Sequence, residues 1–229
     1  MLPPVTDVWF PDPHDAGADG IVAIGGDLSV PRLLAAYDHG IFPWYDRDTP
    51  PLWWSPDPRA VIEVGDLHVS RSLARSLRSG RFRVTLDADF PGTIRGCADR
   101  PEGTWILPEM ITAYEALHEA GHAHSVEVWV EGQLAGGLYG VHRGALFAAE
   151  SMFHRVTDAS KIALVHAVRG FAALGIELFE VQMLTTHLAS LGASEIPRTT
   201  YLARVAAAVP RRVHLDRSRF EAALAGGLR

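Results

Sequence analysis

Hydrophobic and polar positions follow a regular pattern from about residue 110 onward. Some stretches repeat apolar residues every three or four positions, as amphipathic helices do, and others are short apolar runs bounded by turn residues, as strands are. The pattern predicts helices over 110–119, 158–174 and 197–209, and strands over 124–130, 134–141, 145–153 and 176–182. This order predicts an α/β (α+β) fold in which helices pack on one mixed sheet.

The first sixty residues lack this regularity because turn residues interrupt them repeatedly. One short helix is expected over 29–40, with Ser29 as its cap, an apolar stripe of Leu33, Leu34 and Tyr37, and Gly40 at its end. A helix over 70–80 and a strand over 82–86 follow. We therefore expect a small irregular N-terminal domain over 1–65 and a larger domain over 66–229, with the tail from 210 forming a surface helix.

Composition adds limits on where such a protein works. The single cysteine, Cys97, excludes an internal disulfide, and no apolar run approaches the roughly 20 residues that a membrane span needs. The first sixteen residues lack the basic and apolar regions of a secretory signal. We therefore expect a cytoplasmic protein with no membrane partner. The net charge of −6 argues against non-specific coating of nucleic acid, but it allows a local basic patch.

One short motif matches a zinc site, because residues 118–122 read His-Glu-Ala-Gly-His, the H-E-x-x-H pattern of metalloproteases. Two histidines in this pattern grip a metal only when one continuous helix places them on a single face. Gly121 falls where the helix over 110–119 should end, and His122 is expected to begin the next strand. We therefore expect no metal site here.

Three arginines, Arg71, Arg75 and Arg78, recur at intervals that place them on one face of the helix over 70–80. Arg81 and Arg83 follow closely, so positive charge is concentrated here in an acidic chain. The face is either simply solvated or suited to pairing with phosphates.

Three polar residues interrupt the apolar strands. Glu180 and Gln182 are two positions apart, so they are expected to project from one face of the strand over 176–182. A carboxylate and a carboxamide placed together could orient and deprotonate an amine; alternatively, the strand turns polar where it meets solvent. Glu150 lies among apolar residues, where burying a carboxylate is costly unless it has a polar partner or a functional role.

Trp44, Trp53 and Trp54 lie close together near the N-terminus. Indole rings stack on nucleobases and apolar side chains, but they also hold loop-rich units together, and the two interpretations are compatible. The sequence contains no P-loop, dinucleotide-binding fingerprint or nucleophile elbow, which weakens most nucleotide-binding and covalent-catalysis interpretations.

Seven collinear segments between about residues 10 and 201 carry a further signal: GGDLSVPRLLAAYDHGIFPWY, LWWSPDPRAVI, GHAHSVEVW, GGLYGV, ESMF, DASKIAL and HLASLGASEIPR. In this order they closely resemble the leucyl/phenylalanyl-tRNA–protein transferase family. The resemblance implies a small N-terminal domain followed by a sheet like that of GNAT acyltransferases. It also implies transfer of Leu or Phe, and of Met less well, from tRNA to proteins that begin with Arg or Lys, marking them for N-end-rule degradation. A monomer without metal or organic cofactor is expected.

The resemblance also implies site residues. By position, Gln182 and Glu180 match the catalytic pair, and Glu150 matches the glutamate of ESMF. Positions matching the aminoacyl pocket are Trp105, Leu138, Phe147, Met152 and Phe179, and those near the 3′-terminal adenosine are Trp53 and Trp54. The chain departs from the family pattern at two positions near these residues. Glu180 stands where Asp is usual, which adds about 1 Å of reach and affects its exact role, and Ala149 replaces Gly.

The chemistry is transfer of an aminoacyl group from an activated ester on the tRNA ribose to an α-amine. The amine has an ordinary pKa of about 7.7–8.0, so the reaction needs only positioning and a mild proton acceptor. We expect the Gln182 oxygen to accept a hydrogen bond from the amine and Glu180 to orient Gln182. Glu150 is expected to hold the cationic N-terminal residue or the ribose. Two alternatives are a CoA-dependent acyltransferase and a non-catalytic reader of basic N-termini. Against the first, residues 154–161 lack the glycines that cradle pyrophosphate.

Overall fold

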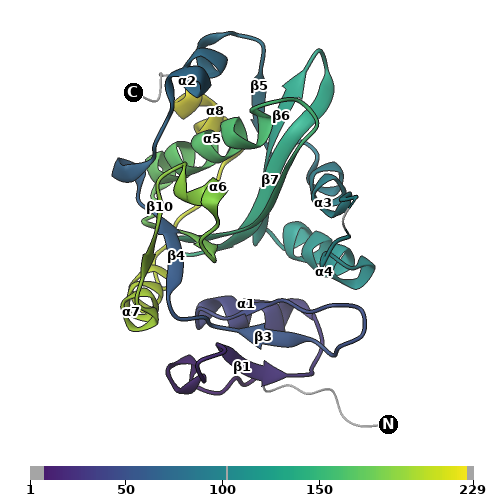
Figure 1. Ribbon diagram of the computed structural model, residues 1–229, viewed down its shortest axis with the longest axis vertical. Coiled ribbons are helices and arrows are strands. Elements are labelled where there is room, and N and C mark those ends of the chain that lie inside the picture. The colour runs from purple at the N-terminus through teal and green to yellow at the C-terminus, as the bar shows by residue number, and fades with distance from the viewer. Residues whose placement is uncertain (1–7, 102, 226–229) are drawn as a thin grey trace.

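A computed structural model describes residues 8–101 and 103–225 of the chain. The ends of both expected domains, residues 1–7 and 226–229, lie outside this description, as does part of the stretch in which no secretory signal was recognised. The described chain forms two sheets, a small N-terminal one and a large one that carries most of the helices (Figure 1). None of the helices in the described ranges is long and apolar enough to cross a bilayer.

The small sheet has three antiparallel strands in the order β1-β3-β2. These are β1 (Ile21–Ile24), β2 (Phe42–Pro43) and β3 (Leu52–Trp54), with the 3-10 turn Pro13–Asp15 before them and α1 (Val30–Asp38) between β1 and β2. The helix expected over 29–40 is confirmed. Gly40 ends it with a φ of 71°, and Leu202 and Tyr201 lie where a larger residue would place its Cβ.

The large sheet has seven strands in the order β10-β4-β9-β8-β7-β6-β5. They are β4 (Arg59–Ile62), β5 (Arg83–Leu86), β6 (Ala123–Val130), β7 (Gln133–Arg143), β8 (Leu146–His154), β9 (Leu178–Gln182) and β10 (Ala193–Ile196). All neighbours are antiparallel except β8 and β9, so the mixed sheet is confirmed. The chain passes from the small sheet to the large one between Trp54 and Arg59, after which a 3-10 turn, Val64–Asp66, follows β4.

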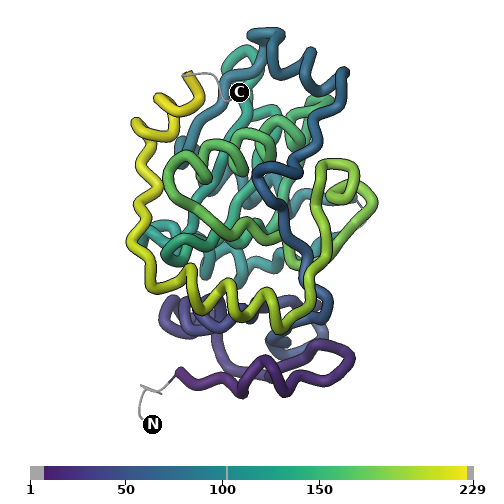
Figure 2. The backbone as a smooth tube through the Cα atoms, turned by 90° about the vertical axis from the view of Figure 1, so that its left-hand side faces the viewer, coloured from purple at the N-terminus to yellow at the C-terminus, as the bar shows by residue number. Residues whose placement is uncertain are grey.

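Helices cover both faces of the large sheet (Figure 1). They are α2 (Arg71–Arg78), α3 (Phe90–Ala98), α4 (Pro108–Glu119), α5 (Ala159–Leu174), α6 (Thr186–Ala189), α7 (Arg198–Ala208) and α8 (Arg217–Ala225). One core lies between the sheet and α5, and a second lies between the opposite face, α3, α4 and the small N-terminal unit. After α7 the chain runs back along the large sheet to α8, which packs on α5 and β5 (Figure 2).

Helix α3 was not expected, because its sequence, FPGTIRGCA, contains one proline and two glycines. Asp89 starts it by accepting a hydrogen bond from the Gly92 N–H at 2.9 Å. Gly96 is required by packing, since the Phe153 ring lies only 2.5 Å from the place of an added Cβ. Tertiary contacts thus stabilise a helix that intrinsic propensity disfavours.

Candidate active site

Strands β8 and β9 lie side by side for a short distance and then separate. The pairs are Leu146 with Leu178, Phe147 with Phe179 and Ala148 with Glu180. Directly beyond, β8 contains a β-bulge: Tyr139 of β7 pairs with Ser151 and Gly140 pairs with Ala149, so Glu150 is the extra residue. A bulge bends a strand and redirects the side chain at that point. Here it brings the Glu150 carboxylate within reach of the end of β9.

Gln182, the last residue of β9, is the side chain that meets Glu150. Its Nε2 donates a hydrogen bond to Glu150 Oε1 at 3.1 Å, and no residue in the described ranges donates to its amide oxygen. Its backbone adopts a φ of 57°, a left-handed conformation that costs a non-glycine residue about 1 kcal/mol or more. Gln182 is therefore tethered through its nitrogen, and the residue lines the space between the strands.

That space is a cavity of about 470 Å³. Its wall includes Phe42, Pro43 and Trp44 of the small unit, Trp105, residues 150–152 of β8, Gln182 and Met183, and Leu188. A smaller apolar recess of about 80 Å³ shares Glu150, Met152 and Gln182 and is closed by Leu138, Leu164 and Leu188. The site thus combines an apolar recess with one convergent carboxyl–carboxamide pair, the usual character of a small-molecule site.

A chain of hydroxyl groups supports Glu150 from the side of the second core. The Tyr114 hydroxyl donates to Glu150 Oε2 at 3.2 Å, and it lies 2.5 Å from the hydroxyl of Tyr37. Tyr37 belongs to α1 and Tyr114 to α4, so this network connects the N-terminal unit to the bulge. Burial raises the pKa of Glu150 to about 8, outweighing the hydrogen bonds that lower it. The carboxyl is therefore mainly protonated at neutral pH, and a cation entering the cavity would favour its ionised form.

Glu180, the other carboxylate matched to the family site, does not line the cavity. It is fully buried, and both oxygens accept hydrogen bonds from Arg59 of β4, at 2.6 and 3.0 Å. Within the described ranges no hydrogen bond joins Glu180 to Gln182. The left-handed backbone at Gln182 ends the simple alternation from which a shared face was expected.

The expected pocket residues divide into two groups. Trp105 and Met152 line the large cavity, and Leu138 and Met152 line the apolar recess. Phe147 and Phe179, with ring centroids 5.3 Å apart, belong to the core beneath the recess rather than to its wall.

The two adjacent tryptophans support the site indirectly. Trp53 is buried and donates from Nε1 to the carbonyl of Gly25 at 2.8 Å. Trp54 donates from Nε1 to the carbonyl of Trp44 at 2.5 Å, and its ring lies 5.7 Å from that of Trp44. Trp44 is the tryptophan of this group that reaches the cavity.

The arginines of α2 are placed apart from the cavity, at the end of the large sheet away from the small unit (Figure 1). Arg71, Arg75 and Arg78 are all exposed, as the helical spacing predicts, and α2 packs through Leu73. Arg81 and Arg83 continue the patch and lie over the rings of Phe82 and Trp129.

Sequence reasoning missed Arg59, Tyr37, Tyr114 and Arg100. Arg100 holds the bulged strand by donating to Ser151 Oγ at 3.1 Å and to the Met152 carbonyl at 3.3 Å, and it lines the cavity. For Arg59 a signal existed, because a charged residue opens the apolar run RAVI. Nothing local marks the tyrosines, whose partners lie far away in the sequence.

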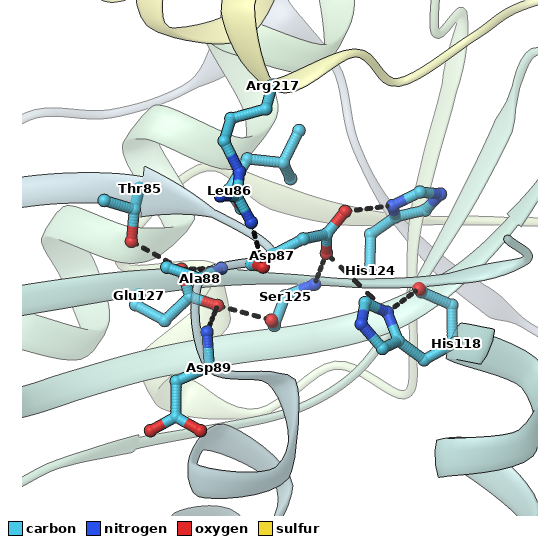
Figure 3. Close-up of polar contacts among 11 residues, drawn as sticks. Thr85, Leu86, Asp87, Ala88, Asp89, His118, His124, Ser125, Glu127 and Arg217 are labelled. Atoms are coloured by element: carbon cyan, nitrogen blue, oxygen red, sulfur yellow. Dashed lines mark hydrogen bonds and ion pairs between the residues drawn. The ribbon is translucent and has the colours of Figure 1, made fainter.

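Of the two histidines in the zinc-like pattern, His118 lies on α4, whereas His122 lies in the turn before β6. Helix α4 ends at Glu119, and Gly121 has a φ of 78°. His118 Nδ1 bonds the Ala123 carbonyl at 2.8 Å, and His122 Nδ1 lies 3.5 Å from Nη1 of Arg143. The next histidine along the chain, His124, is outside the pattern and places its Nδ1 2.7 Å from Asp87 (Figure 3). Across residues 8–101 and 103–225, no three side chains meet in a way that could hold a metal ion.

Comparison with known proteins decides the family. The family model for leucyl/phenylalanyl-tRNA protein transferase matches residues 61–206, and the model for its N-terminal domain matches residues 26–57. The chain belongs to this family. It is 55% identical over 203 residues to the leucyl/phenylalanyl-tRNA–protein transferase of Solidesulfovibrio magneticus, covering 87% of this chain and 82% of that protein. It is also 55% identical over 209 residues to that of an Anaeromyxobacter species, covering 90% and 89%.

Among solved structures, the chain is similar to a GCN5-related N-acetyltransferase from Kribbella flavida, with a TM-score of 0.39 and 14% identity over 70% of this chain and 58% of that one. Family membership makes this protein an aminoacyltransferase, with an aminoacyl-tRNA as donor and a protein as acceptor.

Proposed function

We propose that the protein transfers Leu or Phe, and Met less well, from tRNA to the α-amine of proteins that begin with Arg or Lys, and so marks them for N-end-rule degradation in the cytoplasm. The observation that carries this proposal is the Glu150–Gln182 pair at the junction of a large cavity and an apolar recess. Glu150 is the one acidic side chain on the described wall, and it suits a basic acceptor residue.

The donor's aminoacyl side chain fits the apolar recess. Leu138, Leu164 and Leu188 close the recess, and flexible Met152 adapts to either Leu or Phe. The ester carbonyl then lies near Gln182, and the terminal adenosine lies against the aromatic wall formed by Trp44 and Trp105, with Trp54 behind Trp44. Base–aromatic stacking contributes about 1–3 kcal/mol per base, which suits a short single-stranded end.

The acceptor amine attacks the ester carbonyl; an N–C bond forms, the ester C–O bond breaks, and one amine proton replaces the acyl group on the ribose oxygen. The Gln182 oxygen accepts a hydrogen bond from the amine and so directs its lone pair at the ester. When the acceptor's cationic side chain approaches Glu150, it lowers the pKa of this carboxyl from about 8, so binding a basic N-terminus releases a proton.

Labelled transfer tests the function. The protein is incubated with radiolabelled Leu-tRNA or Phe-tRNA and with peptides that begin with Arg or with citrulline, its neutral isostere. Label on the Arg peptide, at least about tenfold faster than on the citrulline peptide, supports the proposal. Binding of the Arg peptide without label would instead indicate a non-catalytic reader, and acylation from acetyl-CoA would indicate the CoA-dependent alternative.

The exposed arginines of α2 are expected to contact tRNA phosphates. Each of the single variants Arg71→Ala, Arg75→Ala and Arg78→Ala should weaken tRNA binding and reduce the slope of log affinity against log salt by about 0.7–0.9 for each lost contact. Filter binding of charged tRNA at several salt concentrations measures both quantities. Arg212→Ala, which removes one exposed arginine elsewhere, is the matched control. Slopes equal to that control would show that the face is only solvated.

A further inference from the structure

Arg59 occupies an unusual environment for an arginine, because it is fully buried at the start of β4. Its Nε donates to Glu180 Oε2 at 2.6 Å and its Nη2 donates to Glu180 Oε1 at 3.0 Å. This is the two-bond geometry in which a guanidinium fixes both the position and the plane of a carboxylate. Glu180 therefore has both oxygens engaged away from the cavity.

The rest of the guanidinium contacts two other parts of the molecule. Nη1 donates to the Gly40 carbonyl at 3.1 Å, and Nη2 also donates to the Tyr201 hydroxyl at 3.2 Å. The guanidinium carbon lies 4.7 Å from the Phe42 ring centroid and 4.3 Å from that of Tyr201. Arg59 thus connects β9 to the small N-terminal unit and to α7 at once.

Two of the connected parts, the small unit and β9, line the active site. Phe42 lines the cavity from the small unit, and Gln182 lines it from β9, two residues after Glu180. In the sheet, Ala60 pairs with Gln182 and Val61 with Glu180, so Arg59 also adjoins the end of β9 through the backbone ladder. A shift of the Arg59–Glu180 pair would therefore change the distance between the aromatic wall and the Gln182 amide.

We infer that Arg59 is a positioning residue for aminoacyl transfer, and that Glu180 acts as its partner rather than touching the substrate. This inference rests on the proposed function for its activity readout. It also explains why position 180 tolerates Glu where Asp is usual. Arg59 is held by several other contacts, so its partner needs only a carboxylate that reaches Nε and Nη2 of the guanidinium. Neither side chain carries a proton for the reaction.

The test compares four variants in the labelled-transfer assay with an Arg peptide and charged tRNA, together with thermal melting. Arg59→Met should lower kcat about 10- to 100-fold, with KM for both substrates changed less than about threefold, because misplacement near 1 Å costs this much in rate. Glu180→Gln retains an oxygen for Arg59 and should lose less than about tenfold, with an unchanged pH profile. Gln182→Ala marks the loss expected for a side chain that touches the substrate.

The double variant Arg59→Met/Glu180→Leu guards against simple unfolding, because an apolar pair of similar volume commonly replaces a buried ion pair without loss of stability. It should restore the melting temperature while kcat stays low, which supports a positioning role. Recovery of kcat together with stability would show that the pair is only structural and would overturn the inference. A Glu180→Gln loss as large as that of Gln182→Ala would also overturn it. Absence of transfer by the wild-type protein would reject the proposed function instead.

Discussion

Replacing Gln182 with alanine is expected to lower kcat/KM for transfer by about 100- to 1,000-fold while leaving the fold intact. Glu150 holds the amide nitrogen at 3.1 Å and so restricts the amide's rotation. In the proposed function the amide oxygen accepts a hydrogen bond from the attacking amine. Alanine removes that acceptor together with the Nε2 donor to Glu150. Single-turnover transfer with preloaded Phe-tRNA measures the loss at the chemical step.

Two further variants make this result specific. Gln182→Gly should be as inactive as the alanine variant but at least as stable as wild type, because glycine adopts the φ of 57° without strain. Gln133→Ala removes an exposed glutamine at the start of β7 and should retain full activity. Transfer within about threefold of wild type by Gln182→Ala would show that positioning does not depend on this amide.

The regular part of the fold was open to prediction because its signals are local. Helix α5 carries helical periodicity, and the Glu131-Gly132 turn joins β6 to β7. The bounds of all three elements could therefore be predicted to within a residue or two. The helix α3 could not, because its glycine at position 96 is required by a ring from another strand. Sequence shows propensity, but the contact that overrides propensity is made only in the folded chain.

The sequence indicated candidate residues for the site, but not how their side chains are arranged. Gln182 and Glu150 were expected to be functional, and the structure brings them together through a bulge that no sequence pattern indicated. Arg59 and Glu180 are separated by 121 positions in the chain, so their pairing could not be inferred from spacing. The family resemblance pointed to these positions as candidates, whereas the direction of each side chain depends on long-range register.

The two site carboxyls consequently have different environments. Glu180 is matched by a guanidinium, whereas Glu150 is left in the cavity wall with hydroxyl and amide partners only. The charged or titratable groups that face Glu150 are Tyr37, Tyr114, Tyr139, Glu180, Arg59 and Tyr201. Such unequal carboxyls divide roles within one site. Here the unmatched carboxyl, Glu150, is the one proposed to respond to a cationic substrate.

Glu150→Gln is therefore expected to stabilise the protein while removing the proposed preference for basic acceptors. The pKa of Glu150 is raised from 4.5 to about 8, so between these values the unfolded chain releases this proton and the folded chain retains it. Folding stability contributed by this group thus falls as pH rises through the window, and the loss is complete above about pH 8. At pH 7 the neutral glutamine should raise the free energy of unfolding by about 3 kcal/mol.

Urea unfolding of wild type and Glu150→Gln at pH 5 and pH 8 measures this linkage. The stability gap should be below about 1 kcal/mol at pH 5 and widen to several kcal/mol, on the order of 4, at pH 8. Glu131→Gln makes the same charge change at an exposed site and should show no comparable gap.

In the transfer assay the Glu150→Gln variant should use Arg and citrulline peptides almost equally. A stability difference that does not change with pH would contradict the raised pKa of a buried Glu150. Retained preference for the Arg peptide would place acceptor recognition at another residue. A carboxyl that lowers folding stability because it lacks a charged partner is the pattern expected of a binding site.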